Sequence, residues 1–307
     1  MSEKTLIVVD ISSMIYAGVK KDYCKIKGKM VKTVNGYRAN DVSCGGISYL
    51  FNLIHDNLGE CDFVFCGDRT PTIKLNMYPQ YKKNRNYTGD KENIERQKEI
   101  AELILEDCGF QVIARDGYEA DDIIYSICKL YKSQYDKILV YVNDADLYIV
   151  VDDNVEIMPP AANGKHITRE NYERACFKNE ITPYNTVTFG KFLYGCKSDN
   201  VNPLYPTSLA RAISKDFYVP SNYEVLADKA RLRAYIEMMY PQALTQFDVI
   251  YPLDVDVTVL PTEWNVSRIK VWADKIDCFS FRDTSVNEVN YEIEDERISK
   301  IIEEEIL

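Results

Sequence analysis

The 307-residue sequence lacks several patterns by which common enzyme classes are recognised. Its nine cysteines form no Cys-x-x-Cys pair and it has only two histidines, which disfavours a zinc site. It has neither a Walker A loop nor a Gly-x-Gly-x-x-Gly motif, which disfavours a nucleotide kinase or a dehydrogenase. It also has no internal repeat and no low-complexity linker. With 46% apolar and 28% charged residues, the composition is typical of a soluble globular protein with a large core.

The sequence also has no long hydrophobic run near its start. The apolar stretch of residues 6–9 ends at Asp10 and is too short for a signal peptide or a membrane span. Because the cysteines show no disulfide-like or metal-like spacing, we interpret them as reduced core residues. These features predict a cytoplasmic protein that does not enter a membrane.

The net charge of −11 is unevenly distributed along the chain. Residues 1–100 hold 16 Lys and Arg against 12 Asp and Glu, residues 101–200 hold 10 against 17, and residues 201–307 hold 11 against 19. A basic first third beside an acidic remainder fits a polyanion-binding face next to a carboxylate-rich centre, although solvated surface charge gives similar sums.

Short apolar strands alternate with helical patterns in the first half of the chain. The expected strands are residues 5–9, 61–66, 110–114 and 137–142, and the expected helices between them are 44–58, 91–108 and about 120–132. This alternation predicts βαβ units, and so an α/β fold with a central, mostly parallel sheet flanked by helices. The basic stretch of residues 20–38 is expected to be a hairpin that turns at Asn35-Gly36.

The second half of the chain has fewer signals. We expect a helix near residues 221–240, a strand over 247–260 because polar and apolar residues alternate there, and a helix over 267–279. The tail, residues 288–307, is acidic with a stripe of four isoleucines, Ile298, Ile301, Ile302 and Ile306. This stripe either packs on the body of the protein or binds a partner.

Carboxylates follow each of the four predicted strands. They are Asp10, Asp68, the cluster Glu119, Asp121 and Asp122, and the pair Asp144 and Asp146. One acidic cluster at a helix start could be only a cap. Four strands of a parallel sheet, however, bring their carboxyl ends to one edge, where ligands bind.

So many acids at one edge would repel each other, and a divalent cation would relieve the repulsion. Oxygen-only ligands favour Mg²⁺ or Mn²⁺, and two such ions could clamp a phosphate. A calcium loop at Asp144-Ala-Asp146 is the alternative, but the glycine of such a loop is missing. If the acids are uncompensated, Asp122→Asn should raise the melting temperature of the metal-free protein.

Six motifs in order along the chain resemble those of the metal-dependent 5′-nucleases. This family includes the 5′→3′ exonuclease domain of bacterial DNA polymerase I, the flap endonucleases and the RNase H of T-even bacteriophages, and the phage branch looks closest. The motifs are Val8-Val9-Asp10, Phe65-Cys66-Gly67-Asp68, Tyr81-Lys82-Lys83-Asn84-Arg85, Tyr118-Glu119-Ala120-Asp121-Asp122-Ile123-Ile124, Asn143-Asp144-Ala145-Asp146 and Lys197-Ser198-Asp199-Asn200-Val201.

The resemblance implies roles for individual residues. The metal-binding acids would be Asp10, Asp68, Glu119, Asp121, Asp122, Asp144, Asp146 and Asp199, with Asp122 and Asp144 essential for catalysis. Lys82 and Arg85 would lie on a helical arch over the site, within residues 70–95, and stabilise charge on the scissile phosphate. Lys83 and Lys191 would bind substrate, and Tyr81 would stack on a terminal base.

The resemblance also implies an organisation, with an α/β nuclease core over residues 1–180 and a mainly helical region over 181–307. The chain departs from the family pattern twice. Cys196 stands where the family has an acid, so the second ion would bind weakly unless Cys196 lies turned into the core. Residues 202–208 contain no glycine, so the helix-hairpin-helix of the family is degenerate here, although a helix from Thr207 remains expected.

The implied function is Mg²⁺-dependent hydrolysis of phosphodiesters at the 5′ ends of DNA or RNA–DNA hybrids, as in removal of RNA primers or flaps during phage replication. The implied partners are DNA with 5′ ends, flaps or primers, and a single-stranded DNA-binding protein or clamp; the protein would act as a monomer in the cytoplasm, of the host if a phage encodes it. Two rivals remain. One is a DNA-binding relative that has lost catalysis through Cys196, and the other is a PIN-type ribonuclease.

Overall fold

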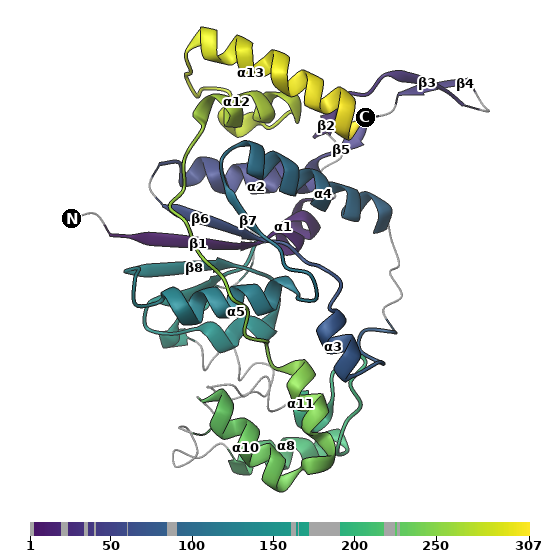
Figure 1. The fold of residues 1–307 in the computed structure, drawn as a ribbon, viewed down its shortest axis with the longest axis vertical. Helices are drawn as coiled ribbons and strands as arrows, with labels where there is room; N and C mark the ends of the chain where they lie inside the picture. Colours follow the sequence, from purple (N-terminus) through teal and green to yellow (C-terminus); the bar gives the residue numbers. More distant parts are fainter. Residues whose placement is uncertain are drawn as a thin grey trace. The chain divides into compact units, whose positions relative to one another are not determined.

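The computed structural model describes residues 3–19, 24–33, 36–39, 41–59, 61–84, 91–160, 164, 166–171, 191–217, 225 and 228–307. The central sheet is formed by β7, β6, β1, β8 and β9. Their bounds are β1 Thr5–Asp10, β6 Asp62–Cys66, β7 Gln111–Ile113, β8 Lys137–Tyr141 and β9 Val155–Met158. The first four strands match the predicted strands to within one or two residues, and helices flank the sheet (Figure 1). The predicted α/β fold is therefore confirmed.

The chain is divided into two compact units, each built from several stretches of sequence. One unit contains residues 2–67, 88–113 and 259–307, and the other contains residues 68–87 and 114–258. We call them the β1 unit and the β8 unit, after a strand of each. The expected division at residue 180 follows a different boundary, because strands and helices far apart in sequence pack together within each unit.

In the β1 unit, the three strands pair in parallel with aligned ends. Asp10 lies opposite Cys66, and Cys66 lies opposite Ile113, so these three residues form a row at the carboxyl ends of the strands. The helices of this part are α1 Ile11–Gly18, α2 Gly45–Asp56 and α4 Lys91–Asp107. Helix α1 packs on α2 and α4 (Figure 1), and a Cβ on Gly46 would lie 2.7 Å from the Ile15 Cα, so only glycine permits this approach.

The basic stretch forms the predicted hairpin. Strands β3 Met30–Thr33 and β4 Gly36–Ala39 pair in antiparallel fashion, and β2 Lys25–Ile26 pairs with β5 Val42–Ser43 below them. The residues of the predicted turn are only partly described, since Asn35 lies outside the described residues.

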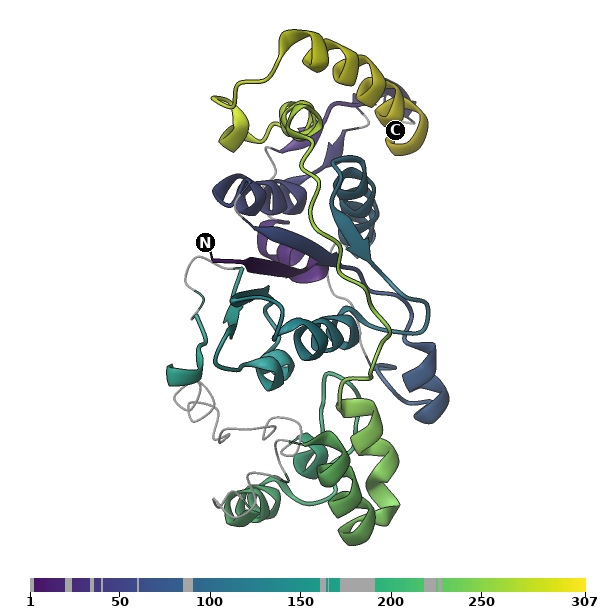
Figure 2. The ribbon, with the colours of Figure 1, turned by 60° about the vertical axis from the view of Figure 1, so that its left-hand side comes forward.

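The acidic tail packs on its own unit. It consists of α13 Glu288–Ile301 and a last turn, η5 Ile302–Ile306, beside α12 Val266–Lys275 and the turn η4 Phe279–Phe281 (Figure 2). Ile298, Ile302 and Ile306 are buried. The Arg297 guanidinium forms two hydrogen bonds of 2.7 Å to the Asp107 carboxylate at the end of α4. The interpretation that the isoleucine stripe packs on the body is confirmed.

The β8 unit contains strands β8 and β9 and a group of helices. They are α3 Thr72–Met77, α5 Ala120–Tyr131, η1 Ala145–Val150, α8 Thr207–Phe217, α10 Lys229–Met239, η3 Pro241–Ala243 and α11 Leu244–Ile250. Helix α8 begins at the expected Thr207. The described part of the expected arch consists of α3, a turn over residues 78–84 and the first turns of α4; residues 85–90 lie outside the described residues. In the described part of the chain, no helix combines the length and the apolar content needed to cross a membrane.

The strand expected over residues 247–260 is wrong. Residues 244–250 are helix α11, and the chain from residue 251 to 265 is extended without joining the sheet. Burial does alternate there, with Val255 and Val257 buried and Asp256 exposed. The backbone N–H groups bond to side chains instead of a neighbouring strand, as Val255 N–H does to Ser126 Oγ at 2.8 Å. Alternation therefore marked an extended segment with one buried face, which needs no strand partner.

Candidate active site

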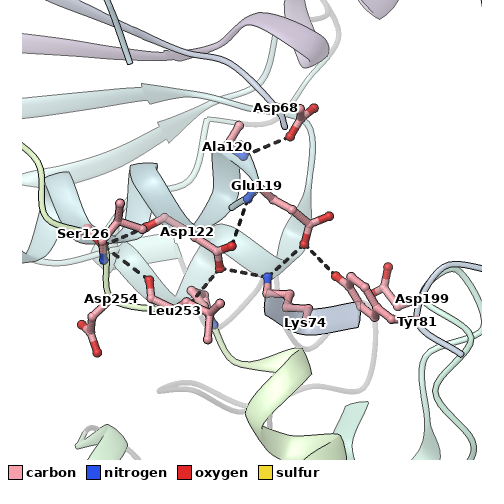
Figure 3. Close-up of polar contacts among 12 residues, drawn as sticks. Asp68, Lys74, Tyr81, Glu119, Ala120, Asp122, Ser126, Asp199, Leu253 and Asp254 are labelled. Atoms are coloured by element: carbon pink, nitrogen blue, oxygen red, sulfur yellow. Dashed lines mark hydrogen bonds and ion pairs between the residues drawn. The ribbon is translucent and has the colours of Figure 1, made fainter. Parts of the chain in front are cut away.

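Acidic side chains gather at the N-terminus of α5 in the β8 unit. The Glu119 side chain accepts from the Asp122 N–H, and the Asp122 carboxylate accepts from the Glu119 N–H at 3.1 Å, which makes a reciprocal capping box. Asp68, two residues after β6, accepts from the Ala120 N–H at 3.0 Å (Figure 3). Helix-end N–H groups thus stabilise these carboxylates, so the capping interpretation holds for Glu119 and Asp122.

A lysine that the sequence did not single out compensates two of these acids. Lys74 in α3 is 3% exposed, and its ammonium lies 2.9 Å from Glu119 Oε2 and 2.8 Å from Asp122 Oδ1 (Figure 3). Burial alone would lower the pKa of Lys74, but the two carboxylates outweigh burial and raise it. The only sequence signal was a lone cation between the apolar Ile73 and Leu75 of a short helix.

Glu119 is the most heavily contacted acid of the site. Besides Lys74, it accepts a 2.8 Å hydrogen bond from the Tyr81 hydroxyl and forms an ion pair with Lys82. Burial would raise the pKa of Glu119, but the Lys74 and Lys82 ammonium groups lower it to about 2. Glu119 therefore remains ionised at neutral pH.

Tyr81 does not have the expected position. Its ring is 4% exposed and packs in an apolar cluster with Cys196, Val201 and Val249. A buried ring offers no face to a nucleobase, so the expected stacking role is corrected. In its place, Tyr81 supports Glu119 through its hydroxyl.

A turn and a loop far apart in sequence are joined backbone to backbone. The Lys82 N–H donates to the Asp199 carbonyl at 2.9 Å, and the Asn200 side chain donates to the Gln80 carbonyl at 2.7 Å. Lys82 (φ 55°) and Asn200 (φ 57°) both adopt the left-handed conformation, which non-glycine residues rarely take without a reason. This junction brings the Lys82 ammonium to 3.8 Å from Asp199 Oδ1, next to Glu119.

The second acidic pair lies at the end of β8. The Asp144 carboxylate caps η1 by accepting from the Asp146 N–H at 2.9 Å, and Lys191 forms an ion pair with Asp146. Burial, with the nearby Asp144 and Asp199, raises the pKa of Asp146 to about 6 despite Lys191. One buried Asp146 oxygen, Oδ1, accepts no hydrogen bond.

These elements enclose one cavity with an acidic wall. Lys74, Lys82 and Tyr81 complete the polar part of the wall, and Leu147, Ile250 and Pro252 form its apolar side. The carboxylates of the wall are Glu119, Asp121, Asp144, Asp146 and Asp199.

The remaining predicted residues lie elsewhere. Asp122 is fully buried behind the wall, and Asp68 is bonded to Ala120 without lining the cavity. Asp10 belongs to the β1 unit, where it caps α1 by accepting from the Ser12 N–H at 2.9 Å. Lys83 is exposed, and Arg85 lies outside the described residues.

The donor set of the wall suits a hard divalent cation. In this structure no three of the described His, Cys, Asp and Glu side chains converge closely enough to hold an ion, since lysines neutralise several of the acids. Even so, five oxygen-only side chains face one cavity, and one of their buried oxygens accepts no hydrogen bond. Mg²⁺ and Mn²⁺ favour such ligands, and the acids would have to close on an ion from their present positions.

Cys196 is turned into the core, the alternative that the sequence had left open. It is 5% exposed in the same cluster as Tyr81, and its sulfur lies 3.0 Å from Asp199 Oδ2. Burial raises the pKa of the thiol, so it remains protonated and donates to Asp199. Cys196 therefore orients an acid of the wall without being a cavity-facing ligand itself.

Cys196→Asp should destabilise the protein without lowering the Mg²⁺ requirement. A carboxylate in this apolar cluster would lie beside Asp199 and would repel it. We expect the melting temperature to fall by several degrees in thermal unfolding, while Cys196→Ser, which keeps a donor, loses much less. A stable Cys196→Asp protein that needs less Mg²⁺ would contradict this account.

Comparison with known proteins gives a consistent result. Residues 5–180 match the family model described as 5′-3′ exonuclease, N-terminal resolvase-like domain. The chain is 28% identical to DNA polymerase I of Mycobacterium bovis over 200 residues, or 65% of this chain and 21% of that protein. It is also 28% identical over 198 residues to a 5′-3′ exonuclease of Aquifex aeolicus, covering 64% of each chain.

Solved structures are similar over most of the chain. The T5 5′-exonuclease with bound divalent zinc ions aligns with a TM-score of 0.52 and 17% identity, covering 97% of this chain and 99% of that one. The catalytic core of Rad2 in complex with a DNA substrate aligns with a TM-score of 0.51 and 15% identity, covering 89% and 88%. These identities establish a shared fold. The chain spans about a fifth of the matched DNA polymerase I and somewhat under two thirds of the matched exonuclease.

Proposed function

The chain belongs to the 5′-3′ exonuclease family, and we propose that it is a divalent-metal-dependent nuclease that hydrolyses phosphodiesters at the 5′ ends of DNA or RNA–DNA hybrids. One observation carries this proposal. Five carboxylates and the Lys82 ammonium, drawn from separate segments, line one cavity. That combination suits a reaction in which cations and a fixed positive charge meet a phosphate.

Within this proposal, Glu119, Asp121, Asp144, Asp146 and Asp199 hold one or two Mg²⁺ ions, and Mn²⁺ can replace them. When bound, the ions would polarise the scissile phosphate and activate the attacking water. Asp10 and Asp68 remain predicted ligands.

The lysines act on the substrate. Lys82 is 20% exposed at its side chain and fixed by the turn–loop junction, so its ammonium can reach a phosphate and stabilise the charge that develops in the transition state. Lys191, paired with Asp146, is placed to contact a neighbouring phosphate. Lys83 and Arg85 would extend this basic surface.

The proposal is tested with 5′-labelled flap, nicked and RNA-primed duplexes in Mg²⁺, in Mn²⁺ and in EDTA. We expect cleavage that starts from the free 5′ end, stops in EDTA and returns when Mg²⁺ is restored. A matched duplex with a blocked 5′ end should be a poor substrate. This experiment also tests the proposed role in primer or flap removal, since it ranks RNA against DNA ends.

Two outcomes would redirect the proposal. DNA binding without cleavage in either metal would favour a binding protein of the same fold. Cleavage of circular single-stranded RNA, which has no 5′ end, would favour a PIN-type ribonuclease. A replication partner such as a clamp or single-stranded DNA-binding protein belongs to the same proposal, and so does a monomeric state.

A further inference from the structure

The site contains a buried cation that the proposed reaction does not use. Lys74 is 3% exposed, whereas lysines are almost never buried unless they are paired. Its ammonium lies between Glu119 and Asp122, at 2.9 Å and 2.8 Å. Lys74 lies in α3 and the two acids lie at the start of α5, so this one charge joins two elements of the cavity (Figure 3).

The two partners of Lys74 differ in what they face. Glu119 lines the cavity, whereas Asp122 does not and is 0% exposed. Asp122 is held by the backbone, since Oδ1 accepts from the Leu253 N–H at 2.8 Å and Oδ2 accepts from the Glu119 N–H at 3.1 Å. Lys74 is thus tied to a fixed carboxylate on one side and to a cavity carboxylate on the other.

The fixed side is itself part of a hydrogen-bonded network. The Ser126 hydroxyl donates to the Asp122 carbonyl at 2.8 Å and accepts from the Val255 N–H at 2.8 Å. The extended segment therefore meets α5 at Asp122 and at Ser126, and its Pro252 lines the cavity. The Lys229 ammonium donates to the Pro252 carbonyl at 2.6 Å and secures the segment from α10.

We propose that Lys74 is a positioning residue, whose ammonium, anchored on Asp122, holds the Glu119 carboxylate in the cavity wall ready for a cation. This rests on the proposed metal-dependent function for its purpose, but the geometry stands without it. Asp122 is then the anchor of the bridge and not a direct ligand. The sequence-based expectation for Asp122→Asn is reversed as well: the charge is compensated, so its loss should lower the melting temperature.

Lys74→Met tests the proposal, because methionine keeps much of the volume and removes the charge. Breaking a buried ion pair from one side is strongly destabilising, so the melting temperature of the metal-free protein should fall by roughly 10 °C. The double variant Lys74→Met/Asp122→Asn should recover part of that loss, because it leaves one fewer unpaired charge. If Lys74→Met does not fold, Lys74→Gln and the double variant are compared in its place.

The decisive measurement is the stabilisation by metal. Without Lys74 the cavity carries one more uncompensated negative charge, so saturating Mg²⁺ or Mn²⁺ should raise the melting temperature of Lys74→Met by several degrees more than that of the unchanged protein. Lys270→Met is the matched control: Lys270 is 9% exposed, pairs with Asp274 at 2.9 Å in α12 and does not line the cavity. Its metal-induced shift should equal that of the unchanged protein.

Kinetics supply a second readout. Because Lys74 is buried, Lys74→Met should lower kcat by about 10–100-fold per folded molecule and leave the KM for DNA nearly unchanged. Equal metal-induced shifts in Lys74→Met and in the unchanged protein would overturn the inference and leave Lys74 a purely structural residue. If the unchanged protein cleaves nothing, the proposed function fails, and the melting comparison still decides the role of Lys74.

Discussion

Asp144→Asn lowers the rate of cleavage by about 10³-fold or more and leaves the protein folded. Asp144 lines the cavity and is exposed, so no buried charge is disturbed by the change. Its role at η1 is to accept from the Asp146 N–H, and an asparagine oxygen caps a helix equally well. The change therefore removes little beyond a negative charge that would hold a catalytic cation, whose contribution is several kcal/mol.

The measurement is the single-turnover rate on a 5′-flap duplex in saturating Mg²⁺, with thermal unfolding in parallel. Asp153→Asn is the matched control, because Asp153 is a highly exposed acid of the same unit and lies outside the cavity wall. It should cleave like the unchanged protein. An Asp144→Asn protein that cleaves within tenfold of the unchanged rate would sink the metal-site proposal.

Lys82→Ala is expected to slow the chemical step by about 10²–10³-fold while the affinity for DNA changes little. The Lys82 ammonium lies among Glu119, Asp199 and the open cavity, so its charge is available when the phosphate gains charge. Its backbone N–H still bonds to the Asp199 carbonyl after the change, so the turn–loop junction persists.

Single-turnover rates at saturating enzyme, together with binding measured in Ca²⁺, separate the two effects. Lys132→Ala provides the control, since it removes a lysine from a surface ion pair with Asp152 outside the cavity wall. A Lys82→Ala protein with an unchanged rate and weaker binding would make Lys82 a substrate-binding residue only. An unchanged rate and unchanged binding would leave it a solvated side chain.

The sequence could predict the acids better than their partners. Asp10, Asp68, Glu119 and Asp144 each follow an apolar run of strand length, and parallel strands align their ends, as the row Asp10, Cys66 and Ile113 shows. Lys74 carried no such signal. Whether a lysine compensates an acid depends on a distance of about 3 Å across the fold, which spacing along the chain does not encode.

Burial was the other quantity that the sequence could not supply. Tyr81 and Asp122 stand in the same motifs as Lys82 and Asp121, yet the first two are buried and the last two line the cavity. The extended segment after α11 shows the same limit. Its alternation revealed one buried face at Val255 and Val257, but not that Ser126 and Asp122 side chains would replace a neighbouring strand.

The sequence by itself determined the order of strands and helices and the edge of the sheet at which acids would gather, because hydrophobic period and strand ends are local properties. It also determined the family, through six motifs in order. Only the tertiary structure decided which acids face the cavity, which are neutralised by Lys74, Lys82 and Lys191, and that Cys196 faces the core. Those outcomes depend on contacts between segments more than a hundred residues apart, such as Gln80 with Asn200, and folding alone brings such segments together.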